Sequence, residues 1–505
     1  MPDAKISLSI TPLDTITTIN PNLYGHFAEH LGACIYGGVW VGEDSSIPNI
    51  GGIRRDVVDA LKRIAPPVVR WPGGCFADDY HWEDGIGPRA QRPRRVNIWW
   101  GEDIETNAFG THEFIQFCRL ISAQPYICGN VGSGAPREMR NWVEYANFGG
   151  DSTLARQRAA NGSPEPFGVR YWGVGNENWG CGGSFCPEDY AAEYKRFATF
   201  LGDFGGPPLY LIACGPAGND PDWTRRFFTK LGGYRRIHAF AAHYYCGTAG
   251  TATEYTTDEW YQLIERSLAM EPLIVQQRAI IDSFSPTANE QRRGDPRPKV
   301  DLIVDEWGTW HPPAPGHNPH HLWQQNTLRD ALVAAASLDI FNRHADKVVM
   351  GNIAQTINVL QAMILTDGPR MVTTPTYHVY AMYQAHQGGH RVPTTFEADE
   401  ITFSDAGSQK RLFGLNGSAS LKDGIITLSV VNPHVEAPVE ATIDLRAAPC
   451  RQVTATVLTH SDIHAHNTFA EPDIVQPQTT ALNVSGRQWR YTFAPASVTV
   501  LRITL

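Results

Sequence analysis

Short apolar runs alternate with amphipathic stretches along most of the chain. Each run is four to nine residues long and most end in a polar residue, which is typical of a buried parallel strand. We predict eight such strands, at 22–30, 67–70, 125–130, 170–175, 209–214, 239–245, 300–306 and 347–355. The stretches around them carry apolar residues at helical spacing, which predicts helices at 53–64, 112–123, 136–148, 188–201, 223–231, 257–284, 325–343 and 375–386.

This alternation predicts a parallel sheet covered by helices. Eight repeats favour a closed (β/α)8 TIM barrel over an open doubly wound sheet. No glycine fingerprint for a dinucleotide follows the first strand, which disfavours a Rossmann fold further.

The pattern changes near residue 386. From Phe396 to Leu505 the chain consists of short alternating runs broken by turns such as Asp423-Gly424, which predicts a β-sandwich of the jelly-roll kind. Residues 5–13 also alternate but have no helix after them, so we expect this strand to join the sandwich. The predicted domains are a catalytic barrel at 18–385 and a sandwich formed by 1–17 and 386–505.

Charge and cysteine content narrow the class of protein. The formal net charge of −10 disfavours a nucleic acid partner, because phosphates would meet a repulsive field. The N-terminal residues lack the pattern of a secretory signal, and no apolar run is long enough to cross a bilayer, so we expect a cytoplasmic protein without a membrane partner. Nine cysteines in such a chain favour reduced thiols, with a local Cys181–Cys186 pair as the alternative.

Two glutamates stand at the ends of predicted barrel strands. Glu177 follows the fourth strand and Glu306 ends the seventh. The strand ends of a barrel converge on its catalytic face, and a pair of carboxyl groups there is the apparatus of glycoside hydrolysis. The alternative is that each glutamate pairs with an arginine in the barrel mouth. The sequence does not give the gap between the two groups, which leaves retention and inversion of the anomeric carbon both open.

Other polar residues follow the same strand ends and suit the binding of sugar hydroxyls. They are Glu29, Arg70, Asn130, Asn176, His243, Tyr245 and Gln355. The spacings match no zinc motif, so we expect no metal. Cys75 is interpreted as a packed or substrate-flanking thiol rather than a nucleophile. His311, His317, His320 and His321 lie among Pro and Gly residues, which favours a solvated or lid-like loop.

Eight segments, taken together and in order, resemble the α-L-arabinofuranosidases of glycoside hydrolase family 51 over nearly the whole chain. They are GHFAEH at 25–30, RWPGG at 70–74, YHWEDGIGP at 80–88, ETNAFG at 105–110, GNE at 175–177, HYY at 243–245, DEW at 305–307 and IAQTINV at 353–359.

The resemblance implies a (β/α) barrel with a C-terminal β-sandwich, no metal or other cofactor, and a homo-oligomer. It also implies an exo-acting, retaining enzyme that removes terminal arabinofuranosyl groups from arabinoxylan- and arabinan-derived oligosaccharides. Glu177 would be the acid/base and Glu306 the nucleophile. Another furanosidase, an endo-acting β-glycanase and a non-catalytic carbohydrate-binding protein are the rival hypotheses.

By the same resemblance, three residues contact the furanose or the nucleophile: Glu29, Asn176 and Gln355. Three more support the glutamates: Arg70 keeps Glu306 ionised, His243 lies near the acid/base and Tyr245 near the nucleophile. The segment with Trp99 and Trp100 lines the pocket or packs beside it. Many relatives have Asn at the position of Cys75, and a thiol is a poor hydrogen-bond partner, so that contact is expected to differ here.

Overall fold

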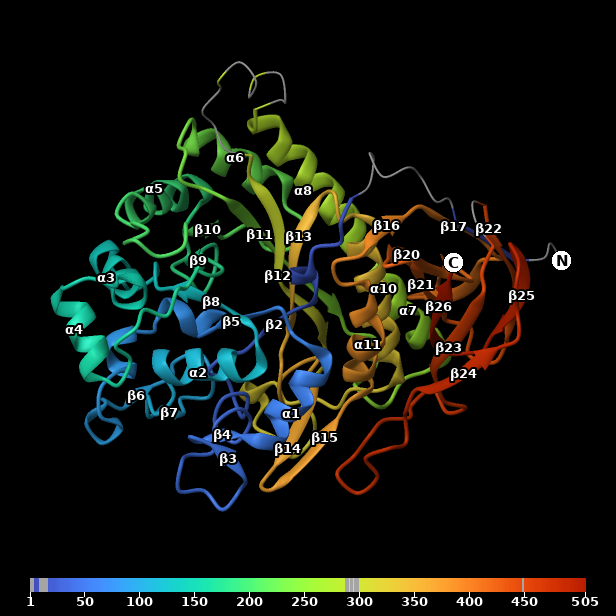
Figure 1. Cartoon of the computed structure of the whole chain (residues 1–505), viewed down its shortest axis with the longest axis horizontal. Helices are drawn as coiled ribbons and strands as arrows, with labels where there is room; N and C mark the ends of the chain where they lie inside the picture. Colours follow the sequence, from blue (N-terminus) through green and yellow to red (C-terminus); the bar gives the residue numbers. More distant parts are fainter. Residues whose placement is uncertain (1–3, 9–16, 287–289, 291–293, 295–298, 447–448) are drawn as a thin grey trace.

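The computed structural model describes residues 4–8, 17–286, 290, 294, 299–446 and 449–505. Within these residues, eight parallel strands close into a barrel in chain order, which confirms the predicted TIM barrel (Figure 1). The strands are β2 (Gly25–Phe27), β5 (Val68–Trp71), β8 (Gln124–Gly129), β9 (Tyr171–Val174), β10 (Tyr210–Ala213), β11 (Ala239–Gly247), β12 (Asp301–Trp310) and β13 (Val348–Ala354).

The helices of the barrel lie close to the predicted ranges, with two exceptions. They are α1 (Arg55–Ile64), α2 (Thr111–Ile121), α3 (Pro136–Asn147), α4 (Thr153–Ala160), α5 (Pro187–Ala198), α6 (Pro221–Leu231), α7 (Thr257–Ser267), α8 (Met270–Phe284), α10 (Leu328–Arg343) and α11 (Pro375–Tyr383). The single helix predicted at 257–284 is two helices, and α4 was not predicted. None of the helices in the described part of the chain has the length and apolar character needed to span a bilayer.

Short elements decorate the barrel loops and link the barrel to the sandwich. The short strands are β3 (Asn49–Ile50), β4 (Ile53–Arg54), β6 (Arg95–Val96), β7 (Ile104–Glu105), β14 (Ile364–Asp367), β15 (Arg370–Thr373), β18 (Ile401–Asp405) and β19 (Ser408–Leu412). The 3-10 helices are η2 (Pro21–Tyr24), η3 (Cys75–Asp78), η4 (Trp82–Gly85), η5 (Arg89–Gln91), η6 (Pro319–His321) and η7 (Gln384–His386).

The C-terminal part packs two sheets around its own apolar core. One sheet has the order β17-β1-β22-β25 and the other β16-β20-β21-β26-β23-β24. Their strands are β1 (Ala4–Leu8), β16 (His390–Val392), β17 (Thr394–Glu397), β20 (Asn416–Lys422), β21 (Ile425–Asn432), β22 (Val439–Leu445), β23 (Gln452–Thr459), β24 (Gln478–Leu482), β25 (Gln488–Phe493) and β26 (Ser497–Thr504).

The N-terminal strand joins this sandwich, as predicted. β1 pairs with β17 antiparallel and with β22 parallel, and Ile6 and Leu8 are fully buried in the sandwich core. The remainder of the predicted strand, residues 9–13, lies outside the described residues. The domain boundaries given above stay predictions.

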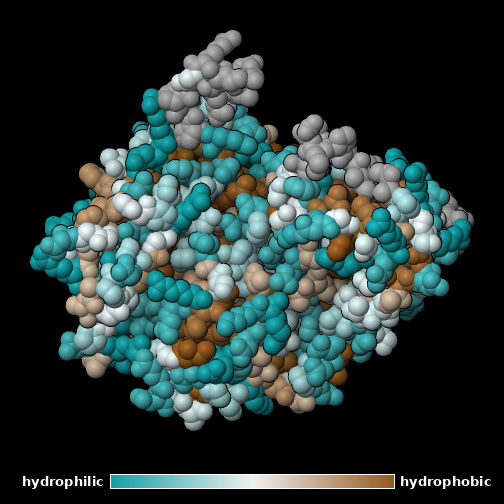
Figure 2. Space-filling view, viewed as in Figure 1, coloured by the Kyte–Doolittle hydropathy of each residue, from teal (hydrophilic) through white to brown (hydrophobic). Residues whose placement is uncertain are grey.

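The barrel and the sandwich meet at α10. Asp339 on this helix is buried and accepts hydrogen bonds from Ser418 on β20, Ser429 on β21 and Tyr383 of α11. This buried carboxyl group holds the two parts together, and the three hydroxyl donors satisfy its oxygens. On the face shown in Figure 2, hydrophilic residues cover most of the surface and hydrophobic residues appear in separate patches.

Candidate active site

The carboxyl ends of the barrel strands enclose one small cavity. It has a volume of about 270 Å³ and is lined by Glu29, Leu31, Gly74, Cys75, Trp100, Glu177, Trp179, Tyr245, Glu306, Trp310, Leu322, Gln355 and Leu360. Small-molecule sites usually measure about 300–1,000 Å³, so this cavity suits a single small ring rather than a long chain. Carboxylates, amides and indoles at one cavity wall are suited to a polyhydroxylated ligand.

Glu177 and Glu306 face each other across this cavity. Glu177 follows β9 and Glu306 lies on β12, with His243 of β11 between them. His243 Nδ1 is 2.8 Å from Glu177 Oε1 and 3.5 Å from Glu306 Oε2, and one oxygen of each glutamate lies within 4.8 Å of the other. Two groups that are 129 residues apart in the sequence are therefore close enough to act on the same atom of a ligand.

Arg70 of β5 fixes the position of Glu306. Its Nη1 donates to Glu306 Oε1 at 2.7 Å and its Nη2 donates to Asn176 Oδ1 at 2.5 Å. Tyr245 donates to the other oxygen, Oε2, at 2.9 Å. Burial raises the pKa of Glu306, and the positive charges of His243 and Arg70 oppose that rise. Glu306 is thus held by three groups, two of them cationic, that favour the ionised carboxylate.

Glu29 forms a second carboxylate centre at the end of β2. Its Oε1 accepts from the backbone of Phe76 and from Trp100 Nε1, each at 3.0 Å, and its Oε2 accepts from Gln355 Nε2 at 3.1 Å. Burial and the nearby charge of Glu306 raise the pKa of Glu29 to about 7. The predicted binding residues Glu29, Gln355 and Trp100 therefore form one hydrogen-bonded group on the cavity wall.

Asp305 belongs to the site but was not predicted. It is buried, with Oδ1 2.9 Å from His243 Nε2 and Oδ2 3.5 Å from Arg70 Nε, and Tyr126 donates to it at 2.8 Å. Burial alone would lower the pKa of His243, but Glu306 and Asp305 raise it well above its usual range. The protonated form of His243 is therefore favoured, since both of its ring nitrogens lie close to a carboxylate oxygen, Nε2 at 2.9 Å from Asp305 and Nδ1 at 2.8 Å from Glu177.

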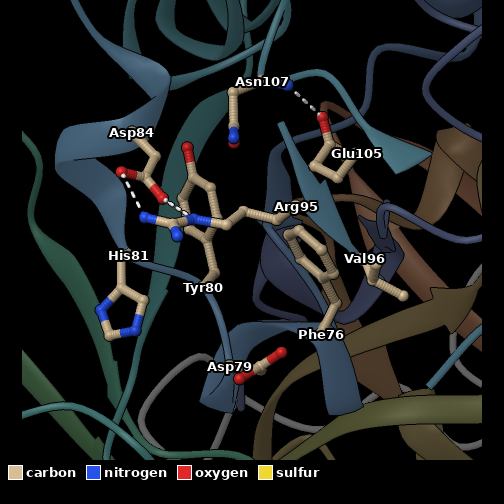
Figure 3. A pocket seen from close by; sticks show the side chains of 9 residues that line it. All are labelled: Phe76, Asp79, Tyr80, His81, Asp84, Arg95, Val96, Glu105 and Asn107. Carbon is tan, nitrogen blue, oxygen red and sulfur yellow. Dashed lines mark hydrogen bonds and ion pairs between the residues drawn. The ribbon is translucent and has the colours of Figure 1, made fainter. Parts of the chain in front are cut away.

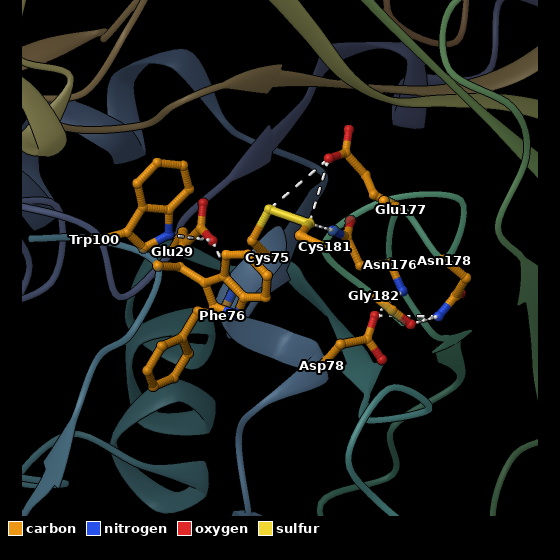
Figure 4. Close-up of a disulfide and its surroundings, with 12 residues drawn as sticks. Glu29, Cys75, Phe76, Asp78, Trp100, Asn176, Glu177, Asn178, Cys181 and Gly182 are labelled. Carbon is orange, nitrogen blue, oxygen red and sulfur yellow. Dashed lines mark hydrogen bonds between the residues drawn. A yellow bond between two sulfur atoms is a disulfide. The ribbon is translucent and has the colours of Figure 1, made fainter. Parts of the chain in front are cut away.

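The expectation of reduced thiols is wrong for Cys75 and Cys181. These residues form a disulfide between the loop after β5 and the loop after β9, with Cα atoms 5.5 Å apart (Figure 4). Cys181 therefore pairs with Cys75 and not with Cys186, which is free and exposed. The two sulfurs lie 3.9 and 3.6 Å from Glu177 Oε2, so the disulfide forms part of the wall beside this carboxylate. Cys75 is not a free thiol in the cavity.

We predict that a dithiol reductant opens this site to alkylation. Without reductant, iodoacetamide should label the exposed Cys186, which serves as the internal control, but not Cys75 or Cys181. After reduction, Cys75 and Cys181 should also be labelled. Activity should then fall at least about tenfold, because each adduct occupies the space beside Glu177. Peptide mass mapping and activity are measured on the same samples. Labelling of Cys75 without reductant would contradict the disulfide.

Two residues that the sequence singled out, Asn130 and His311, lie outside the cavity. Asn130 does not face the cavity: its Oδ1 accepts from the backbone of Ser133 and Gly134, and its Nδ2 donates to Ser133 and Tyr80, so it folds its own loop. His311 is buried against Asp330 at 2.8 Å and does not belong to a lid.

Of the other histidines of this loop, His317 and His320 are exposed and His321 is half-buried, and none of them lines the cavity. His317 stacks on Trp323, His321 pairs with Asp103 at 2.7 Å, and the next residue, Leu322, lines the cavity. Trp99, unlike Trp100, is not among the residues that line the cavity.

Among the described residues, two groups of three side chains have potential metal ligands within 4.8 Å of one another. Cys75, Glu177 and Cys181 form the first, but the two sulfurs are bonded to each other. Glu177, His243 and Glu306 form the second, in which both nitrogens of the cationic His243 already face carboxylates. Neither group offers three free ligands of the kind that a divalent ion requires.

Comparison with known proteins places the chain in a family. The family described as "Alpha-L-arabinofuranosidase 1 domain" matches residues 60–262, and "Alpha-L-arabinofuranosidase C-terminal domain" matches residues 305–497. An "Intracellular exo-alpha-L-arabinofuranosidase" of Bacteroides ovatus is 43% identical over 94% of this chain and 92% of its own length.

Solved structures similar to this chain point to the same family. The family 51 arabinofuranosidase of Xanthomonas axonopodis pv. citri superposes with a TM-score of 0.92 at 41% identity, covering 99% of this chain and 100% of its own. An α-L-arabinofuranosidase of Thermotoga maritima in complex with arabinose gives a TM-score of 0.86 at 31% identity, with both chains fully covered at 100%. With its barrel, its facing glutamates and these relatives, the chain belongs to the α-L-arabinofuranosidases of glycoside hydrolase family 51.

Proposed function

We propose that the enzyme is an exo-acting, retaining α-L-arabinofuranosidase that works by double displacement. The observation that carries this proposal is the approach of Glu177 and Glu306, which have one oxygen each within 4.8 Å of the other. Retaining glycosidases hold their two carboxyl groups about 5–5.5 Å apart, whereas inverting enzymes leave about 6.5–9.5 Å for a water molecule. A gap this short favours direct attack by a carboxylate.

Glu306 acts as the nucleophile and Glu177 as the acid/base. In the first step the Glu306 carboxylate attacks the anomeric carbon, while Glu177 gives its proton to the departing glycosidic oxygen. In the second step Glu177 takes a proton from water, the resulting hydroxide adds to the anomeric carbon, and the bond to Glu306 breaks. Arg70 and Tyr245 hold Glu306 ionised for attack, and the imidazolium of His243 orients Glu177.

The cavity wall supplies recognition of the sugar. Glu29 and Gln355 on the wall offer hydrogen-bonding oxygens and nitrogens to ring hydroxyls, and the indole of Trp100 gives a flat surface. Asn176, beside Glu177, would add a further amide. A cavity of about 270 Å³ supports the release of one terminal arabinofuranosyl residue at a time. We propose oligosaccharides derived from arabinoxylan and arabinan as substrates.

We propose that the enzyme acts in the cytoplasm as a homo-oligomer. The Bacteroides ovatus relative is named as intracellular, which supports the location. Cell fractionation tests the location, and light scattering tests the oligomeric state. The Cys75–Cys181 disulfide would meet reducing conditions in that compartment, so the oxidised fraction should be determined on protein trapped with acid during extraction.

Proton NMR of freshly formed product tests the proposal directly. With a panel of defined arabino-oligosaccharides, the first signal should be the α-anomer of free arabinofuranose, followed by mutarotation. Linear xylan and glucan should release no product. Initial appearance of the β-anomer would rule out double displacement, and cleavage inside linear xylan would favour an endo-acting glycanase instead.

A further inference from the structure

The backbone at Glu177 has a conformation that does not form readily by itself. Glu177 has a φ of +40°, in the left-handed region that side-chain-bearing residues rarely adopt. Such a conformation persists only when the surrounding structure determines it. The contacts of the segment 176–182 therefore decide where the Glu177 carboxyl group points.

One buried carboxylate contacts this segment from inside. Asp78, the last residue of η3, is 2% exposed. Its Oδ2 accepts from the backbone N–H of Asn176 at 2.7 Å and lies 3.4 Å from Asn178 Nδ2. These two donors are the residues on either side of Glu177. Asp78 thus contacts the backbone of the residue before the strained position and the side chain of the residue after it (Figure 4).

The other oxygen of Asp78 ties the same segment to the next barrel loop. Oδ1 accepts from the backbone of Val131 at 2.6 Å and of Gly132 at 2.8 Å, both just after β8. Burial raises the pKa of Asp78 to about 7, and the hydrogen bonds from Asn176, Gly132 and Val131 oppose that rise. All four neighbours are N–H donors, so the ionised carboxylate, which only accepts, is the form that satisfies them.

The loop closes over Asp78 because residue 182 is glycine. A Cβ at Gly182 would lie 1.9 Å from the backbone oxygen of Asn176 and 2.5 Å from Asp78 Oδ2. No side chain fits there without moving the segment. Asn178 Nδ2 also donates to the Gly182 backbone at 2.7 Å, which completes the closure.

We propose that Asp78 is a positioning residue for the acid/base: through the backbone of Asn176 and the side chain of Asn178 it holds the two neighbours of Glu177 in the arrangement that aims the carboxyl group at the leaving oxygen. This inference rests on the proposed role of Glu177 and extends it to a residue that does not touch the sugar. In Figure 4 the carboxyl group of Asp78 is drawn beside Gly182 and Asn178, apart from the carboxyl group of Glu177.

Asp78→Asn tests the proposal. An amide can accept from one pair of donors but must turn its NH₂ toward the other pair, so the segment shifts. A displacement of about 1 Å at a catalytic group can cost about 100-fold in rate. We compare kcat/KM, which reports the first step alone, because the second step needs Glu177 as a base with either substrate. We expect kcat/KM on an arabino-oligosaccharide to fall about 30- to 100-fold. On an aryl arabinofuranoside with a good leaving group, release of the aryl group needs no protonation, so kcat/KM should fall less than about threefold.

The matched control is Asp79→Asn. Asp79 is the next residue but lines a separate pocket with His81 and Arg95 (Figure 3), and both substrates should be hydrolysed at the wild-type rate. A purely structural role for Asp78 would lower the folded fraction, and the two substrates would then lose activity by the same factor. Equal losses on both substrates, or no loss on either, would overturn the proposal.

Gly182→Ala gives an independent test if Asp78→Asn does not fold. Its added methyl group would collide with the backbone oxygen of Asn176 and displace the same segment. The variant should therefore show the same selective loss on the oligosaccharide. Glu177→Gln is measured in parallel. If Glu177→Gln lacks the selective loss, the proposed acid/base is wrong. If Glu177→Gln shows it while Asp78→Asn and Gly182→Ala do not, only the positioning role fails.

Discussion

Glu306→Ala should abolish turnover on every arabinofuranoside, with activity reduced at least about 10⁴-fold. The nucleophile takes part in both steps of the proposed reaction, and losing a residue of this kind costs about 10⁴- to 10⁶-fold in other hydrolases. Arg70 and Tyr245 are left without their shared acceptor, but neither can attack carbon in place of a carboxylate. Steady-state rates on an aryl arabinofuranoside and on an oligosaccharide should fall together.

Azide gives this experiment a sharper outcome. The small cavity left by the shortened side chain admits azide on the face from which Glu306 attacks, so the variant should convert an aryl α-arabinofuranoside into the β-arabinosyl azide. Asp301→Asn is the matched control, because Asp301 begins the same strand at the opposite end of the barrel and bonds to Tyr210 at 2.6 Å. It should retain catalysis. A Glu306→Ala protein with ordinary activity would exclude Glu306 as the nucleophile.

The architecture was predictable because hydrophobic periodicity is a local signal. Strands and amphipathic helices read from the sequence correspond to the barrel and the sandwich. α4 has hardly any apolar stripe, since only Ala155 and Arg158 on it are buried, so periodicity could not reveal it. The break between α7 and α8 falls at Leu268 and Ala269, which continue the apolar pattern and so hide the interruption.

The candidate site was largely predictable for a geometric reason. Polar residues that end parallel strands must meet at one face of a barrel, whatever their separation in sequence. This reasoning did not predict Asp305, because neighbouring side chains in a regular strand point to opposite sides and Glu306 was already assigned to the inner side. The structure departs from regular pairing here: the register shifts between Ala242 and His243 and again between Val304 and Trp307. Such irregularities re-aim side chains near active sites, and both acids face Arg70.

The Cys75–Cys181 disulfide could not be predicted from the number or the spacing of the cysteines. Cys75 and Cys181 are 106 residues apart, and they meet because β5, β8 and β9 are neighbours in the barrel. The spacing of Cys181 and Cys186 suggested a local pair instead. The expected cellular compartment and the spacing of cysteines are both judged from the sequence alone. Which cysteines pair depends on which loops the barrel places next to each other.

Glu177→Ala should separate substrates by the quality of their leaving group. A general acid contributes about 10²- to 10⁴-fold where the departing oxygen needs a proton, so oligosaccharide hydrolysis should fall by that factor. An aryl arabinofuranoside with a strongly acidic phenol needs no proton to depart. Its first step should remain close to the wild-type rate, and the glycosyl-enzyme should then accumulate, because no base activates water.

The accumulated intermediate makes the role of Glu177 directly testable. Rapid mixing should show a burst of phenol equal to the enzyme concentration, followed by a slow steady rate. Azide, which needs no base, should accelerate the slow phase and yield the α-arabinosyl azide, the opposite anomer to that expected from Glu306→Ala. Glu188→Ala is the control, because Glu188 lies in the first turn of α5, just after the loop that carries Glu177, and pairs with exposed Arg226. The two variants, Glu306→Ala and Glu177→Ala, should give opposite azide anomers. The anomers therefore identify which glutamate attacks the sugar and which transfers the proton. A β-azide from Glu177→Ala would reverse the assignment.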